Sequence, residues 1–402
     1  MSNLRAGSGP LSKDLVRAAP FAARDGVGQL RGFIVSSTVK VMPVVPRRLA
    51  ALAVLGSLVL LVTACTWRAS GTRPAWELDN PIEPLPALPA GFEGRWDRLS
   101  SPPTPERVRL GRWLFYDFRL SADGTVSCGT CHRPDQAFSQ TEPVSTGVFG
   151  RRGTRKSQGF ANQAWASTPH LFWDGRVASF EAQAILPLTT AHEMGLTADE
   201  LVTIVDGIAG YRPYFREAFG DEDVTVDRIV RAIADYEKTR LSGNSPWDRW
   251  QHRREQGAVD AQVRRGHELF FGQAACQPCH MGPNFTDGGF HNIGVGWDAE
   301  TGRFSDEGRF AVTGEDVDRG AFKTPSLRDV SKRAPYMHDG SVATLREVVE
   351  LYNRGGVPNP HLSGKIFPLG LTDADIEALV AFMQALDSGL PPEAPPVSFP
   401  PF

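Results

Sequence analysis

The sequence has 402 residues, of which 41% are hydrophobic and 22% are charged, a composition typical of a globular protein. Its 43 basic and 46 acidic side chains nearly balance, with a formal net charge of −3. This balance excludes a polybasic nucleic-acid-binding protein and an acidic disordered chain. The length allows two or three domains with their own hydrophobic cores, so the fold does not need a disulfide scaffold.

The first element in chain order is an apolar stretch at residues 49–64, which follows Arg47 and Arg48. This stretch is shorter than the about 20 residues of a membrane-spanning helix, and a short apolar segment after a basic flank is typical of a secretory signal. It ends in Val-Thr-Ala-Cys, which resembles a bacterial lipobox, so we predict cleavage before Cys65 and lipid modification of that cysteine. The alternative is an uncleaved anchor helix with an incidental cysteine. Both interpretations place the protein outside the cytoplasm, and we expect a periplasmic protein anchored to the membrane by lipid.

Residues 1–41 fit no export signal, because they lie upstream of the basic flank. Met42 lies where a signal peptide should begin, so we expect translation to start at Met42 rather than at Met1. Residues 1–64 hold 8 of the 43 basic and 2 of the 46 acidic side chains, so the rest of the chain has a net charge of −9. An acidic protein of this kind favours a partner with a basic face.

Proline-rich segments suggest how the chain is divided. After the leader at residues 1–64, closely spaced prolines predict a stiff linker at 65–103, and a similar segment forms a tail at 391–402. Between them we predict two domains, at 104–245 and 246–390.

Four of the five cysteines form two copies of the pattern Cys-x-x-Cys-His. The copies comprise Cys128, Cys131 and His132, and Cys276, Cys279 and His280. Two thiols at this spacing can form thioether bonds to the vinyl groups of a haem, and the histidine then binds the iron. A zinc site made of four cysteines is the alternative, but zinc does not require a histidine directly after each pair. The pattern therefore predicts two covalently bound c-type haems, one in each domain.

Helix signals are frequent around these motifs. Four threonines precede segments whose apolar residues recur at helical spacing; they are Thr197, Thr225, Thr344 and Thr372. A further helix through residues 266–271 leads into the second motif, and no long alternating strand pattern is present. We therefore predict a mainly α fold with two cytochrome c-like haem domains.

Several ordered motifs between residues 105 and 386 resemble the bacterial di-haem cytochrome c peroxidases and MauG. Besides the two haem motifs, they are Leu-Gly-Arg at 110–112, Leu-Phe-Tyr-Asp at 114–117, Arg-Leu-Ser at 119–121, Phe-Trp-Asp-Gly-Arg at 172–176, Glu-Met-Gly at 193–195, Phe-Lys-Thr-Pro-Ser-Leu-Arg at 322–328 and Pro-Tyr-Met-His-Asp-Gly at 335–340. The resemblance implies an oxidoreductase that acts on hydrogen peroxide.

Within that family, the second haem is typically held by histidine and methionine, whereas MauG has a tyrosine in place of the methionine. The matching position here is Tyr352, which lies on the apolar face of its expected helix. We favour Tyr352 as the second ligand of this haem iron, with Met337 as the alternative. Tyrosine stabilises oxidised iron and lowers its reduction potential, while methionine raises that potential.

The first haem is expected to have an open coordination position. Family peroxidases often carry a blocking histidine in the loop after the first motif, but residues 133–160 contain neither histidine nor methionine. His170 and His192 are the nearest alternatives. We expect each to lie at the surface or to contact an iron ligand without binding the iron itself.

The resemblance also assigns catalytic roles. Glu193 matches the distal glutamate, and a carboxyl group in an apolar pocket has the raised pKa that proton transfer needs. Gln183 and Pro187 match residues that position groups in the same pocket. Trp173 resembles the tryptophan between the haems, which relays single electrons. The alternatives are a helix-start or surface charge for Glu193 and plain core packing for Trp173.

Charged residues near the haems raise two further questions. Arg176 and Lys323 are candidates to neutralise haem propionates, with surface ion pairing as the alternative.

The family often holds calcium between its domains, through an asparagine and two backbone carbonyls. The carbonyl positions here are Arg333 and Pro335, but the asparagine position is Lys156, which makes calcium doubtful because a charged lysine cannot bind it.

MauG passes oxidising equivalents to a protein through a surface tryptophan two residues before the second haem motif, where this sequence has Ala274. The quinone-forming reaction of MauG therefore does not transfer to this chain. We expect a MauG-like peroxidase whose electrons come from a small redox protein or an oxidisable protein side chain. The alternatives are a conventional cytochrome c peroxidase with Met337 ligation and a non-catalytic di-haem electron-transfer cytochrome.

Overall fold

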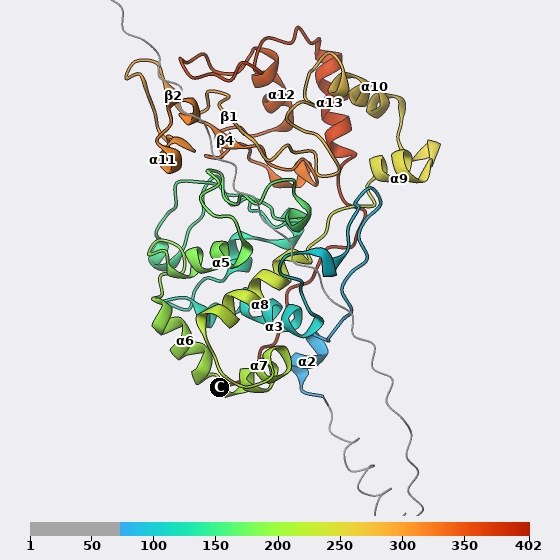
Figure 1. Cartoon of the computed structure of the whole chain (residues 1–402). Coiled ribbons are helices and arrows are strands. Elements are labelled where there is room, and N and C mark those ends of the chain that lie inside the picture. Colours follow the sequence, from blue (N-terminus) through green and yellow to red (C-terminus); the bar gives the residue numbers. More distant parts are fainter. Residues whose placement is uncertain (1–72) are drawn as a thin grey trace, which may run out of the picture. The chain divides into compact units, whose positions relative to one another are not determined.

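The structure is a computed structural model that describes residues 73–402 (Figure 1). The predicted leader and Cys65, the predicted site of lipid modification, lie outside the described residues. Within that range no helix is both long and apolar enough to cross a membrane. The helices are α2 (Ala75–Asp79), α3 (Pro105–Tyr116), α4 (Cys128–Cys131), α5 (Phe180–Thr189), α6 (Ala198–Gly207), α7 (Arg212–Phe219), α8 (Val226–Lys238), α9 (Pro246–Arg253), α10 (Ala261–Phe271), α11 (Phe310–Thr313), α12 (Leu345–Asn353) and α13 (Asp373–Gln384).

Four helices begin where the threonines predict. The hydroxyl groups of these threonines accept a hydrogen bond from the backbone N–H three residues later, which satisfies a donor that the helix itself leaves free. The helices concerned are α6, α8, α12 and α13. The segment before the second motif is helical as well, although α10 begins earlier than the predicted range.

The strands are short, as the absence of alternating patterns predicts. β1 (Phe290–His291) pairs antiparallel with β4 (Phe322–Lys323), and β2 (Trp297–Asp298) pairs antiparallel with β3 (Arg303–Phe304). In the first sheet Phe290 lies opposite Lys323, and in the second Trp297 lies opposite Phe304. The prediction of a mainly α fold is confirmed.

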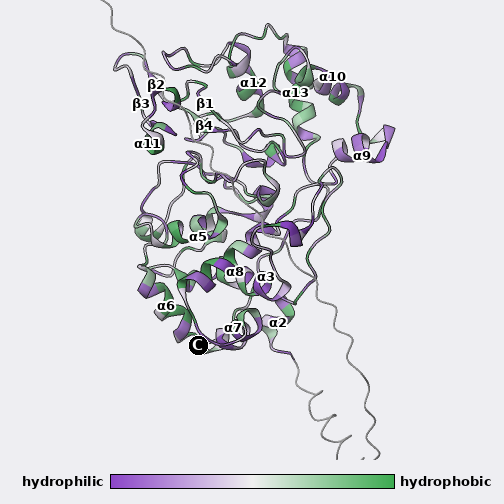
Figure 2. Cartoon of the chain, in the orientation of Figure 1, coloured by the Kyte–Doolittle hydropathy of each residue, from purple (hydrophilic) through white to green (hydrophobic). Residues whose placement is uncertain are grey.

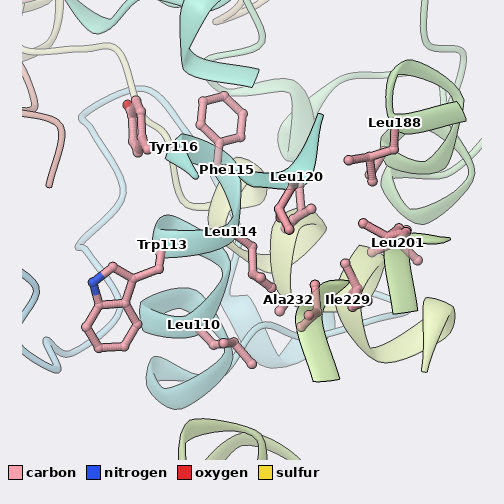
Figure 3. Packing of buried hydrophobic residues seen from close by; sticks show 14 of the residues in the cluster. Leu110, Trp113, Leu114, Phe115, Tyr116, Leu120, Leu188, Leu201, Ile229 and Ala232 are labelled. Carbon is pink, nitrogen blue, oxygen red and sulfur yellow. The ribbon is translucent and has the colours of Figure 1, made fainter. Parts of the chain in front are cut away.

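The first hydrophobic core forms where α3 crosses α8. A Cβ atom at Gly111 would overlap the carbonyl oxygen of Ala232, so only glycine lets the two helices approach this closely. Figure 3 shows Leu110, Leu114 and Phe115 of α3 projecting among residues of the neighbouring helices. α5, α6 and α7 complete this core, which lies beside the first haem motif.

The second core repeats this arrangement. A Cβ atom at Gly266 of α10 would overlap the carbonyl oxygen of Ala378 in α13, so these helices also cross at a glycine. Leu269, Phe270 and Phe382 fill the contact. In each half of the chain, the helix before a haem motif thus packs on a later helix. In Figure 2, α5 and parts of α8 are hydrophobic, whereas α9 is largely hydrophilic.

The proline-rich segments at both ends contact the first core. Trp76 of α2 packs against it, and its indole N–H donates a hydrogen bond to the Tyr214 hydroxyl at 2.7 Å. From the C-terminal tail, Phe399 packs on the same core, and Glu393 forms ion pairs with Arg112 and Arg240. The predicted domain boundaries at 104, 245 and 390 stay predictions.

Candidate active site

Two cavities contain the two Cys-x-x-Cys-His motifs. Cys128, Cys131 and His132 line the first cavity, whose volume is about 950 Å³. Cys276, Cys279 and His280 line the second, whose volume is about 220 Å³. Each cavity therefore presents two thiols and one imidazole, which is the donor set that covalent attachment of a haem requires.

The orientation of both histidines fits this role. The Nδ1 atom of His132 lies 2.8 Å from the carbonyl oxygen of Phe138, and that of His280 lies 2.9 Å from the carbonyl oxygen of Phe285. If Nδ1–H donates these bonds, Nε2 is left as a neutral ligand atom. Burial also lowers the pKa of both imidazoles, which favours the neutral form that binds a metal. The residues present therefore fit one c-type haem in each cavity.

Glu193, Gln183 and Pro187 all line the first cavity, as the resemblance implies. Glu193 lies in the turn after α5, where its carbonyl oxygen accepts a hydrogen bond of 2.8 Å from the Val148 N–H. The next residue, Met194, is buried, and its Sδ atom lies 4.0 Å from Cys128 Sγ. This turn therefore brings Glu193 into the cavity of the first motif.

The Glu193 carboxyl group has the electrostatic character expected of a proton-transfer group. Burial raises its pKa, and the nearby His192 and Arg176 partly oppose this effect. Among residues 73–402, no side chain forms a hydrogen bond or ion pair with this carboxylate. A partly buried carboxyl without a fixed partner is free to bind and release a proton at the cavity.

The two alternative histidines occupy different places. His192 lines the first cavity, next to Glu193. His170 does not line either cavity and packs against Phe290, with the ring centroids 5.5 Å apart. Of these two histidines, only His192 is placed near the first haem site.

Trp173 lines both cavities. Its indole N–H donates a hydrogen bond of 2.8 Å to the carbonyl oxygen of Lys156, and its own carbonyl oxygen accepts one of 2.7 Å from the Lys323 N–H. These bonds fix the ring between the two haem sites, which is where a one-electron relay must lie.

Tyr352 and Met337 both line the second cavity. Burial raises the pKa of Tyr352, and charge on the thiols of Cys276 and Cys279 adds to this effect. The hydroxyl group forms no hydrogen bond with any residue that the structure describes. The structure thus offers both candidate ligands to the second haem.

The two candidate propionate partners differ in their surroundings. Arg176 lines the first cavity, but it already forms an ion pair with Asp174 at 2.9 Å and stacks on Phe172. Lys323 is buried, lines both cavities, and has its pKa lowered to about 8 by burial. An anionic group in either cavity would stabilise the charged form of this lysine.

Comparisons with known proteins agree with this geometry. A family profile described as di-haem cytochrome c peroxidase matches residues 105–256, and one described as cytochrome c matches 263–387. The methylamine utilization protein MauG of Methylorubrum extorquens is 39% identical over 331 residues, covering 81% of this chain and 90% of that protein. The cytochrome c551 peroxidase of Nitrosomonas europaea is 32% identical and covers 74% of this chain and 83% of its own length.

A solved structure supports the same assignment. The crystal structure of a MauG-like protein associated with microbial copper homeostasis superimposes with a TM-score of 0.66 and 32% identity, covering 77% of this chain and 95% of that one. The chain belongs to the di-haem cytochrome c peroxidase family. It is therefore an enzyme of the peroxidase class with two cytochrome c-like domains and haem c as its cofactor.

Sequence reasoning missed two residues of this di-haem peroxidase that face its cavities. His338 lines both cavities, stacks on Phe322 with 3.7 Å between ring centroids, and has a buried Nε2 atom without a partner in the described residues. Glu237 lines the first cavity, and its buried Oε2 atom has no hydrogen-bond partner there either. His338 lies within a family motif, and Glu237 lies on the ordinary amphipathic helix α8, so neither stands out in the sequence. Their burial beside a cavity identifies them, and burial is visible only in the structure.

Glu237→Gln should change how the stability of this di-haem peroxidase depends on pH. Burial raises the pKa of Glu237 to about 8, above its ordinary 4.5, so the folded protein binds the proton more tightly than the unfolded chain. The free energy of unfolding should therefore fall as the pH rises from about 4.5 to about 8. Glutamine removes this loss, which is on the order of 5 kcal/mol.

Thermal unfolding measured between pH 5 and pH 9 tests this prediction. The difference in Tm between Glu237→Gln and the parent protein should increase with pH. The exposed Glu300→Gln serves as the matched control and should follow the parent at every pH. A constant difference between Glu237→Gln and the parent would contradict the prediction.

Proposed function

We propose that this protein is an exported, MauG-like di-haem peroxidase that reduces hydrogen peroxide in the first cavity. The observation that supports this most directly is the shared Trp173, which lines a cavity with a partly buried, unpaired carboxyl group and a second cavity with its own haem motif. The overall reaction takes up two electrons and two protons per peroxide and releases two water molecules.

The first cavity assembles the groups that this reaction needs. When bound, the haem iron held by His132 supplies the position and the electrons for cleavage of the O–O bond. Glu193 accepts a proton from one oxygen of peroxide and returns it to the other, while Gln183 and Pro187 orient the substrate. General acid–base transfer of this kind contributes about 10² to 10⁴-fold in rate.

The second cavity is the proposed site of the haem that stores and supplies electrons. His280 and Tyr352 would hold the haem iron of this cavity, and Trp173 would carry single electrons between the two cavities. A small redox protein or an oxidisable protein side chain returns the electrons. The position that MauG uses toward its protein partner is occupied here by Ala274, which is not aromatic and is only 3% exposed. The chain therefore offers no aromatic contact to a partner at this position.

Export and membrane attachment complete the proposal. The predicted signal and Cys65 support a periplasmic, lipid-anchored enzyme, and periplasmic export fits covalent haem attachment. A net charge of −9 without the leader favours a donor with a basic face.

Titration of the diferric protein with hydrogen peroxide tests the proposed function. We expect a change in the haem absorption bands with about one equivalent of peroxide, a high-spin ferric EPR signal before addition, and turnover with a reduced donor. A non-catalytic electron-transfer cytochrome has two six-coordinate irons. It would show no high-spin signal, no spectral change and no turnover, and that result would overturn the proposal.

A further inference from the structure

Lys156 lies between the two cavities and lines both of them. It is 5% exposed, although lysine is almost never buried without partners. Its ammonium group donates hydrogen bonds to the backbone carbonyl oxygens of Gln140 and, at 3.4 Å, of Glu142. The buried ammonium group therefore has carbonyl oxygens as partners, which are the ligands that a hard cation such as calcium prefers.

The backbone of Lys156 connects two parts of the site. Its carbonyl oxygen accepts the indole hydrogen bond of Trp173 at 2.8 Å, and its N–H donates to the carbonyl oxygen of His338 at 2.8 Å. Trp173 follows the first haem motif, and His338 follows the second. One residue thus joins the relay tryptophan to the loop that carries the second haem's candidate ligand Met337.

The charges around this position oppose a metal ion. Arg333, which supplies one of the carbonyl positions of the family's calcium site, carries a guanidinium group close enough to lower the pKa of Lys156, and Arg133 acts in the same direction. Glu142 is the carboxylate that opposes them. Burial is the largest cause of this shift, and a pKa of about 8 leaves the ammonium mainly charged at neutral pH. Three cationic side chains and one carboxylate do not fit a divalent cation.

We propose that the ammonium group of Lys156, which donates to the carbonyl oxygens of Gln140 and Glu142, supplies the positive charge between the two haem sites, so that this enzyme holds Trp173 in position without calcium. The positive charge is part of the chain itself, and its ammonium group donates hydrogen bonds to backbone carbonyl oxygens in the loop after the first haem motif. Lys156 is therefore a positioning residue, because it acts through Trp173 and the His338 loop. The proposal does not depend on the proposed function, since metal content and stability are measured without peroxide.

The first test uses the purified di-haem protein. Elemental analysis should find no stoichiometric calcium, and neither EGTA nor added CaCl₂ should change the Tm or the haem absorption bands. One calcium per chain, or a fall in Tm with EGTA, would overturn the proposal. This arm does not require any variant to fold.

The second test replaces the side chain. Lys156→Met keeps the length but removes the charge and leaves buried carbonyls unpaired, so we expect the Tm to fall by roughly 5 °C or more. It should also shift the haem absorption bands, because Trp173 loses its fixed position. Lys156→Arg retains a cation and should restore much of both properties. The matched control Lys332→Met removes a partly exposed ion pair with Asp329 and should change the Tm less. Equal losses in Lys156→Met and Lys156→Arg would contradict a role for the charge.

Discussion

Glu193→Gln should slow the reaction of the protein with hydrogen peroxide by about 100-fold or more, with little change in Tm. Glutamine keeps the shape of the side chain but cannot accept the proton that peroxide must lose. Stopped-flow absorption of the haem bands, with peroxide in excess, measures the second-order rate constant. The Tm should stay close to that of the parent, because no described side chain pairs with the carboxylate.

The pH dependence gives this prediction a second readout. The carboxylate is the active form, and burial raises its pKa, so the parent rate should increase with pH through that raised pKa. Glu193→Gln should lose this dependence. The matched control is Glu268→Gln on α10, whose side chain is 69% exposed, and its rate and pH profile should equal those of the parent. A variant of Glu193 with the parent's rate would exclude the carboxyl group from proton transfer.

Tyr352→Phe should change the absorption and EPR spectra of the second haem and raise its reduction potential by on the order of 100 mV or more. Phenylalanine keeps the packing of the ring but removes the oxygen that would bind the iron. The spectra of the first haem should remain as in the parent. Spectroelectrochemical titration of the purified protein separates the two haems and measures both potentials.

Met337→Leu is the matched comparison, because both residues line the second cavity. If Tyr352 is the ligand, this variant should leave the bands and the potential of the second haem unchanged. The reverse pattern, with Met337→Leu altering the second haem and Tyr352→Phe leaving it unchanged, would show a conventional peroxidase with His/Met ligation. The two variants together therefore decide between the MauG-like and conventional alternatives.

Much of the fold was predictable because its signals are local. A threonine before an apolar-periodic segment reports a helix start within a few residues, and α6, α8, α12 and α13 begin at such positions. Two helices were missed although they carry a similar cap: Thr104 accepts a hydrogen bond at the start of α3, and Ser179 does so at the start of α5. α3 begins at Pro105, and α5 contains Pro187. The close crossings at Gly111 and Gly266 were also missed, because a glycine in a helix does not reveal which distant helix approaches it.

The residues of the candidate site were likewise predictable only in part. The haem motifs are short enough to be recognised in the sequence, and the resemblance supplied Glu193 and Trp173 from neighbouring motifs. Glu237 escaped notice because its sequence context is that of an ordinary amphipathic helix. Its significance comes from its burial beside the first cavity, where it is 5% exposed, and this burial depends on the packing of α8 against α3 and α5.

By itself, the sequence determined the helical class and the family, and it predicted two haem sites with their attachment residues, because each depends on residues close together in the chain. Only the tertiary structure decided that Trp173, Lys156 and His338 meet between the two cavities. It also decided that the Lys156 ammonium binds backbone carbonyls rather than solvent. The physical reason is that a buried charge is stabilised by whichever oxygens the fold brings to it, and those oxygens come from loops that local sequence patterns do not connect.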